Sequence, residues 1–206
     1  MRSFSAKRVI TTRFKELPFT GKWEALVGRP EARGSIIIYG PSGNGKTRLA
    51  LQLAKYLSGF TTVAYNSIEQ GISKTMSQAL AQEGLGDIGA RFRFLDRAPM
   101  DQLEDWLSRP RRPNVIIIDS LQVAGISRKD VTRLYKKFKN KLFIWVCRED
   151  PKTRKPEGSL GRSVEYDADI KIRVEGYRAM AKSRYGGGEP FDVWPDEAAK
   201  YWPDNE

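Results

Sequence analysis

Short apolar runs alternate with segments of helical spacing along most of the chain. The runs 35–39, 61–66, 91–95, 115–119 and 141–147 are rich in strand-forming residues. Between them, apolar residues recur every three or four positions over 48–57, 73–83 and 100–107, which predicts amphipathic helices. Alternation of this kind is typical of a mainly parallel sheet flanked by helices, so we expect an α/β fold.

The two ends of the chain do not follow this pattern. Residues 1–33 carry cations with little periodicity, which predicts a basic N-terminal arm. The core is expected to span 34–194, and the acidic and aromatic residues 195–206 are expected to form a short tail.

A glycine-rich segment lies between the first strand-like run and the first helix. Its sequence is Gly40-Pro41-Ser42-Gly43-Asn44-Gly45-Lys46-Thr47, which fits the phosphate-loop pattern G-x-x-x-x-G-K-[ST]. In such a loop, backbone N–H groups and the helix N-terminus face the phosphates, so Lys46 is expected to reach the β- and γ-phosphates and Thr47 to offer its hydroxyl to Mg²⁺. With Arg48, which follows the motif, these residues form the predicted nucleotide site.

Two carboxylates are placed to complete this site. Asp119 ends the apolar run 115–119, so it is expected at the carboxyl edge of the sheet, where it would hold Mg²⁺ through a water molecule. Glu69 follows the run 61–66 and would lie at the same edge as a general base for hydrolysis. An alternative for Glu69 is an ordinary acid at a helix entry, where the helix dipole favours it.

Composition limits the remaining possibilities. The chain has 206 residues and a formal net charge of +11, which favours a polyanionic partner such as nucleic acid, although solubility alone is an alternative. It contains no histidine and one cysteine, Cys147, which excludes a His-ligated zinc site, a Ser-His catalytic pair and an internal disulfide. No apolar stretch has the length of a membrane span, so we expect no membrane contact and a cytoplasmic location.

These motifs together resemble the RecA superfamily of ATPases. The likeness comes from the phosphate loop, the glutamate after the second strand and the ending Ile118-Asp119-Ser120, and the C-terminal part is similar to the motor core of RadA- and DnaB-type proteins. There, residues 181–186 resemble a Lys-x-Arg motif, 165–170 the entry to the sixth strand and 189–194 the closing strand. The resemblance implies a RecA-like P-loop NTPase fold, a sheet extended by antiparallel C-terminal strands, and ATP with Mg²⁺ as ligands.

The same resemblance assigns roles to later basic residues. Lys182 and Arg184 would reach the nucleotide of a neighbouring subunit in a ring or filament, unless they are simply solvated residues of a hairpin. The segment 148–163 stands where RecA-like proteins have a central DNA-binding loop, so its long polar sequence predicts a loop that follows single-stranded DNA. A flexible surface loop is the alternative. The candidate DNA-binding cations are Lys152, Arg154, Lys155 and Arg162.

Two classes of function follow. The first is an oligomeric ATPase acting on DNA as a motor or as a recombination or replication accessory protein. The second is an ATP-dependent switch or assembly factor that acts on a protein partner or duplex DNA. A small-molecule kinase fits less well, because Lys182 and Arg184 would have no role in a monomeric kinase.

Overall fold

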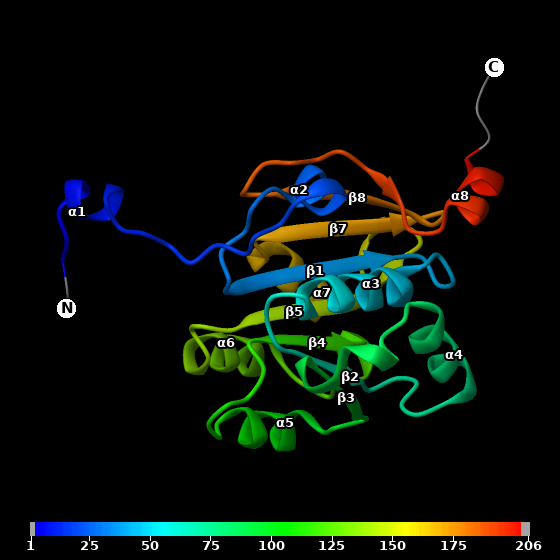
Figure 1. The fold of residues 1–206 in the computed structure, drawn as a ribbon, viewed down its shortest axis with the longest axis horizontal. Coiled ribbons are helices and arrows are strands. Elements are labelled where there is room, and N and C mark those ends of the chain that lie inside the picture. Colours follow the sequence, from blue (N-terminus) through cyan, green and yellow to red (C-terminus); the bar gives the residue numbers. More distant parts are fainter. Residues whose placement is uncertain (1–2, 203–206) are drawn as a thin grey trace.

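A computed structural model describes residues 3–202 of the chain as an α/β fold with helices on both sides of one sheet (Figure 1). The strands are β1 Gly34–Gly40, β2 Val63–Ser67, β3 Phe92–Asp96, β4 Val115–Asp119, β5 Leu142–Asp150, β6 Lys155–Pro156, β7 Ile170–Glu175, β8 Arg178–Ser183 and β9 Phe191–Asp192. The α-helices are α1 Ala6–Ile10, α2 Gly21–Val27, α3 Lys46–Ser58, α4 Lys74–Gln82, α5 Met100–Leu107, α6 Arg128–Lys137, α7 Gly158–Asp167 and α8 Pro195–Tyr201. Short 3₁₀ helices occupy Gly86–Arg91 and Leu121–Val123.

Over residues 3–202 the sheet has nine strands in the order β3-β2-β4-β5-β1-β7-β8-β9, with β6 paired to β5. The strands from β3 to β7 in this order run parallel, whereas β8 is antiparallel to β7 and β9 is antiparallel to β8. This confirms the expected parallel sheet with an antiparallel C-terminal extension. Because β1, β2, β4 and β5 all end at one edge, that edge gathers the residues that follow them.

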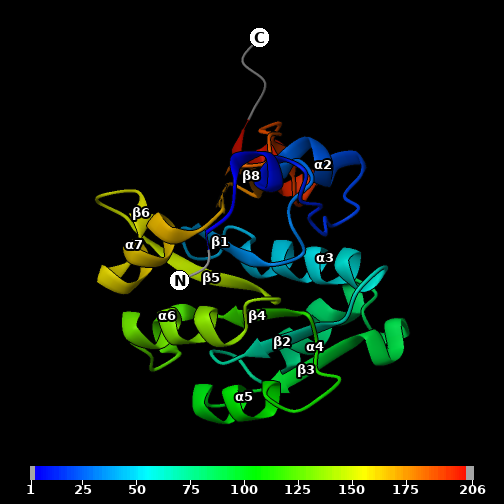
Figure 2. The same cartoon turned by 90° about the vertical axis from the view of Figure 1, so that its left-hand side faces the viewer.

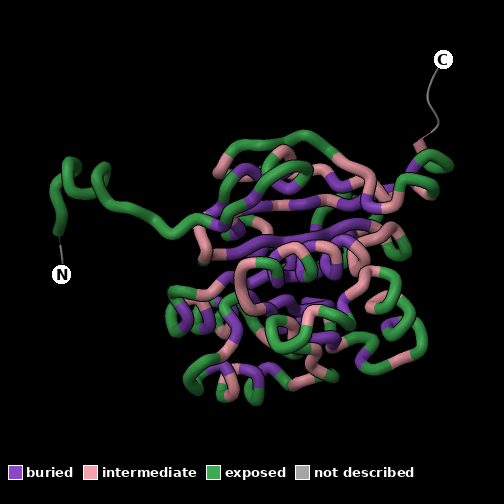
Figure 3. Tube along the Cα trace, viewed as in Figure 1, coloured by how far each residue is buried: buried purple, intermediate pink, exposed green. Residues whose placement is uncertain are grey.

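Alternate residues of the central strands bury against opposite helix layers. Ile36 and Ile38 of β1 pack in the cluster that contains α2 and α3, while Ile37 packs in the cluster that contains α5, α6 and α7. Figure 2 shows these layers on either side of the sheet. In Figure 3 the central strands are buried over most of their length, as expected of parallel strands that are covered on both faces.

The structure divides the predicted N-terminal arm into two parts. Residues 3–14 extend away from the body at the edge where β1 begins and are exposed, with α1 as a single turn (Figures 1 and 3). In contrast, Leu17, Phe19, Trp23 and Leu26 are buried in the α2–α3 cluster. This stretch, which the sequence places in the arm, therefore packs in the same buried cluster as the strands. The many basic residues of this segment hide the pattern of its four large apolar residues, which pack over one end of the sheet.

The segment 148–163, which the sequence predicts as a loop, consists mostly of regular secondary structure. β5 continues to Asp150, turns back into β6, and α7 begins at Gly158. The strand extends into charged residues because Glu149 finds an ion-pair partner in Arg173, which sequence spacing did not reveal. Most of the segment is thus a hairpin followed by a helix.

The C-terminal tail is helical over α8, where Ala198 is buried. Tyr201 lies close to Gly176 in the turn between β7 and β8, since a Cβ on that glycine would collide with its ring. Residues 203–206 of the predicted tail, like residues 1–2 of the arm, lie outside the described residues.

Candidate nucleotide site

The phosphate loop leaves β1 at Gly40 and is fixed by the neighbouring strand β7. A Cβ on Gly40 would collide with the carbonyl oxygen of Val174, so this position requires glycine. The loop tip is held by a hydrogen bond of 2.7 Å from the Gly176 N–H to Asn44 Oδ1. Gly45, the N-cap residue just before α3, has φ +96°, a conformation that favours glycine. The predicted strand, loop and helix are therefore all present.

Lys46 lies within this loop and is largely buried. Its Nζ donates a hydrogen bond of 2.6 Å to the carbonyl oxygen of Pro41. Burial lowers the pKa of Lys46, and the nearby Asp119 carboxylate opposes that shift. A buried ammonium group with one internal acceptor is well placed to gain further from an anion.

Asp119 and Thr47 meet as the sequence predicts. The Thr47 hydroxyl donates to Asp119 Oδ2 at 3.0 Å, and the Tyr65 hydroxyl donates to the same oxygen at 2.5 Å. Burial raises the pKa of Asp119, while the hydrogen bonds from Tyr65 and Thr47 act in the opposite direction. Burial also raises the pKa of Tyr65 well above its ordinary value, so the phenol is the donor.

This group of oxygens fits a magnesium ion. A hydroxyl and a carboxylate beside a phosphate loop are hard ligands of the type that Mg²⁺ uses together with water and substrate phosphates. Within residues 3–202 there is no cluster of three or more His, Cys, Asp and Glu side chains that would form an all-protein metal cage. Thr47 and Asp119 would therefore hold the ion, which would supply positive charge beside the phosphates.

Glu69 lies on the other side of Asp119, as expected for residues at one sheet edge. Its backbone N–H donates to the Asp119 carbonyl oxygen at 3.1 Å. Its side chain accepts a hydrogen bond of 2.6 Å from the Ser120 hydroxyl and forms an ion pair of 2.6 Å with Arg148. Burial alone would raise the pKa of Glu69, but the hydrogen bonds from Ser120 and Arg148 outweigh it, so the pKa is lowered.

These residues surround a cleft of about 630 Å³ at the carboxyl edge of the sheet. Beyond the phosphate loop, its wall contains Tyr177 and Trp194, whose rings meet edge to face with centroids 5.8 Å apart. The Arg48 guanidinium lies over the Trp194 ring at 4.1 Å and also pairs with Glu83. The cleft thus has a charged floor and an aromatic wall.

Lys182 and Arg184 lie away from this cleft. Because β8 runs antiparallel to β7, its last residue, Ser183, is level with Ile170, near the start of the parallel strands. Lys182 is exposed and stands opposite Lys171, and within residues 3–202 no ion pair is found for either lysine. Arg184 pairs with Asp169 at 3.2 Å. Neither predicted residue reaches the nucleotide site of its own chain.

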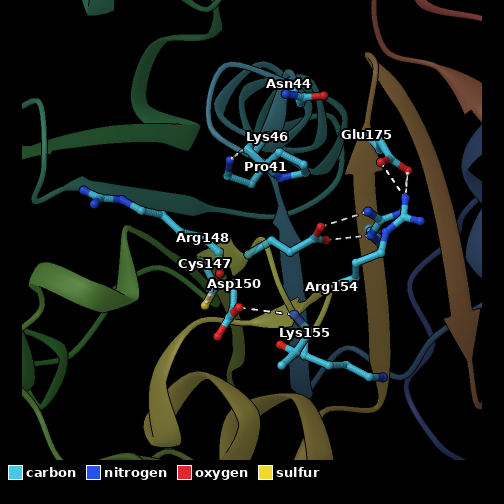
Figure 4. A network of polar contacts seen from close by, with 12 residues as sticks. Pro41, Asn44, Lys46, Cys147, Arg148, Asp150, Arg154, Lys155 and Glu175 are labelled. Atoms are coloured by element: carbon cyan, nitrogen blue, oxygen red, sulfur yellow. Dashed lines mark hydrogen bonds and ion pairs between the residues drawn. The ribbon is translucent and has the colours of Figure 1, made fainter.

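The candidate DNA-binding cations lie on the hairpin and α7. Arg154 bonds Glu175, which also pairs with Arg173, and Arg173 in turn holds Glu149 (Figure 4 draws this network). Lys155 pairs with Glu165 at 3.3 Å. Lys152 and Arg162 are exposed, and in the described part of the chain no ion pair involves them. The predicted cations are therefore partly engaged within the chain.

Sequence reasoning did not identify three groups of the site. Tyr65 was visible only as an apolar strand residue, Ser120 only as part of a motif, and Arg148 only as the first residue of the expected loop. The alternation of side chains along β5 is the sequence signal that could have identified Arg148. Arg148 falls on the same face as Val146, toward the phosphate loop, whereas Glu149 falls on the opposite face.

Fold and site together define a P-loop protein of the α/β class. A scan against protein-family models gave no match, and neither did a search of curated proteins. Among solved structures, the chain is similar to the flagellar accessory protein FlaH from Methanocaldococcus jannaschii, with 18% identity, a TM-score of 0.60, and coverage of 87% of this chain and 95% of that one. It is also similar to the ATPase domain of G40P, with 17% identity, a TM-score of 0.57, and coverage of 81% and 83%.

The fold is RecA-like, as the resemblance in the sequence predicts. Within residues 3–202, no helix is both long and apolar enough to cross a membrane.

Proposed function

We propose that this protein binds ATP with Mg²⁺ in the cleft and hydrolyses it. The observation that carries the proposal is the convergence of Asp119 and Glu69 beside the phosphate loop, with Thr47 bonded to one carboxylate and Ser120 to the other. A simple nucleotide-binding fold needs the first carboxylate but has no use for the second. Hydrolysis needs a base that orients or deprotonates a water molecule, and Glu69 is the group available.

Each group of residues in the site has a separate proposed role in phosphoryl transfer. Backbone N–H groups of the phosphate loop and the Lys46 ammonium would bind the phosphates, and Thr47 and Asp119 would hold the metal. Glu69 would take a proton from the attacking water. The Arg48, Tyr177 and Trp194 wall would contact the remainder of the nucleotide, since it continues the same cleft.

Hydrolysis is proposed to require a second subunit. Lys182 and Arg184 lie toward the edge of the sheet where β1 begins, whereas the cleft lies at the opposite edge, so a head-to-tail arrangement would bring them to a neighbour's nucleotide. Lys182 stands opposite another lysine, an arrangement that costs stability. An anion contributed by a neighbour would offset this repulsion, which supports a role between subunits.

The partner is proposed to be DNA, most simply a single strand. The net charge of +11 and the exposed Lys152 and Arg162 support binding to a phosphate backbone without base readout. Arg154 and Lys155 would join them by exchanging Glu175 and Glu165 for phosphates. Because Arg154 and Lys155 already have carboxylate partners within the chain, their ion pairs support the alternative function to the same extent. In that alternative the protein is an ATP-dependent switch that acts on a protein partner or duplex DNA.

The test is ATP hydrolysis measured with and without single-stranded DNA at low salt. We expect Lys46→Ala to abolish nucleotide binding, and Glu69→Gln to bind ATP but lose hydrolysis by about a hundredfold or more. Arg184→Ala should bind nucleotide and lose hydrolysis, while the exposed Lys136→Ala serves as a matched surface control. Normal hydrolysis by Glu69→Gln would overturn the proposed base. Absence of both DNA binding and DNA stimulation would favour the switch.

A further inference from the structure

Among residues 3–202, Arg148 is the one cation of the cleft that forms a hydrogen bond or ion pair with the candidate base. Its position is set by the sheet, because Arg148 is the register partner of Gly40, where the phosphate loop starts. The alternation of β5 directs its side chain to the same cleft as Lys46 and Thr47. Burial is the main cause that lowers the pKa of Lys46, and the charge of Arg148 adds to it.

The residues on either side of Arg148 are buried, whereas the Arg148 side chain is partly exposed. Cys147 is fully buried, and the Glu149 side chain is 3% exposed and bonded to Arg173. The Arg148 side chain is 45% exposed, and Glu69 is its only ion-pair partner among the described residues. A long side chain on a rigid strand can therefore change partner without moving the strand, and an exposed ion pair offers little resistance to this.

Both oxygens of Glu69 are occupied in this arrangement. Ser120 donates to Oε2 and Arg148 to Oε1, each at 2.6 Å. A carboxylate held by a hydroxyl and a guanidinium is a weak base and has little capacity left for a water molecule. The site as it stands is arranged to restrain the base.

We propose that Arg148 is a latch that responds to the γ-phosphate. In its absence the guanidinium holds Glu69, and when the triphosphate binds, the guanidinium transfers to the terminal phosphate and releases the carboxylate. Phosphate oxygens accept two parallel hydrogen bonds from a guanidinium, and the terminal phosphate carries more charge than one carboxylate. After hydrolysis and loss of phosphate, Arg148 returns to Glu69. The inference rests on the proposed ATPase function and adds a cation supplied by the same chain.

The latch predicts a competition that binding measurements can detect without turnover. Glu69 and the γ-phosphate compete for Arg148, so weakening one contact must strengthen the other. Arg148→Ala should weaken binding of a non-hydrolysable ATP analogue about tenfold while leaving ADP within about twofold, since ADP lacks the phosphate concerned. Glu69→Gln should tighten the analogue severalfold because a neutral amide holds the guanidinium less strongly.

The experiment is calorimetric titration with Mg²⁺ and either ADP or the analogue, on the wild type, each single variant, the double variant and Lys136→Ala. ADP affinity reports that each variant is folded. We expect the gain from Glu69→Gln to vanish when Arg148 is also alanine. Equal weakening of both nucleotides by Arg148→Ala, unchanged analogue binding, or a Glu69→Gln gain that persists without Arg148 overturns the latch alone. A wild type that binds neither nucleotide overturns the proposed function and the latch with it.

Discussion

The hydroxyl of Tyr65 donates a hydrogen bond of 2.5 Å to Oδ2 of Asp119, the same oxygen that accepts from Thr47. Tyr65 is fully buried on β2 and Asp119 ends the neighbouring β4, so the orientation of the carboxylate is set from inside the core. The phenol thus supports the residue that would hold the metal, in the way that outer hydrogen bonds orient metal ligands elsewhere.

Tyr65→Phe should therefore weaken both the fold and the metal site. Removing one donor from a buried carboxylate costs about 1–3 kcal/mol of unfolding free energy. With only Thr47 left as a donor, we expect about tenfold more Mg²⁺ to be needed for ADP binding. Urea unfolding and Mg²⁺ titrations at fixed ADP measure the two effects. Tyr39→Phe on β1 is the matched control, because Tyr39 is also largely buried but its hydroxyl makes no hydrogen bond to Asp119. Equal behaviour of both variants would contradict a role for the Tyr65 hydroxyl.

Arg173 links two carboxylates beneath the phosphate loop. It bonds Glu149 and Glu175 at 2.6 Å each, and this bonding raises its pKa, with Glu149 as the largest cause. Arg173→Ala would leave the nearly buried Glu149 without its partner, so we expect a loss of about 3 kcal/mol or more in unfolding free energy. Arg154→Ala removes an exposed partner of Glu175 and should cost about 1 kcal/mol or less. Denaturant unfolding of both variants tests this contrast, which a similar loss in the two would refute.

The parallel strands and the phosphate site can be predicted from the sequence because each depends on a local pattern of residues. A run such as 115–119 is apolar on both faces, and the phosphate loop has its own spacing. Helix α6 went unrecognised because only Val131 and Leu134 are buried within it, among basic residues. The pairing of Arg148 with Glu69 joins residues 79 positions apart, so no local pattern encodes it.

Helix α6 also provides a pH prediction through its capping box. Ser127 caps the helix by accepting from the Asp130 N–H, while its own hydroxyl and N–H donate to the Asp130 carboxylate. These bonds, those from the Ser127 side chain first, lower the pKa of Asp130 from 3.8 to about 2. A carboxyl whose pKa is lowered by folding stabilises the native state above its unfolded pKa and loses this contribution as the pH falls.

The unfolding free energy of the wild type should therefore decline through the window from pH 3.8 to about pH 2, in part because of Asp130. Asp130→Asn should show a shallower decline over that window. Ser127→Ala should also flatten it, and should cost about 1 kcal/mol at neutral pH through loss of the cap. Urea unfolding at a series of pH values measures all three proteins. Parallel curves for wild type and Asp130→Asn would show that the capping box does not set this pH dependence.

The division of the predicted N-terminal arm gives a further test. Ile10 is 81% exposed and Phe14 50%, whereas Trp23 is 4% exposed and stacks on Tyr56 of α3 with centroids 5.6 Å apart. Removing residues 1–14 should change the melting temperature of the isolated chain by no more than about 2 °C, because all of residues 3–14 are exposed. Trp23→Ala should cost about 3–5 kcal/mol, since it leaves a cavity between α2 and α3. Thermal and urea unfolding distinguish the two cases. If the truncation destabilised the chain as much as Trp23→Ala does, the arm would have to pack on the core, contrary to its exposure.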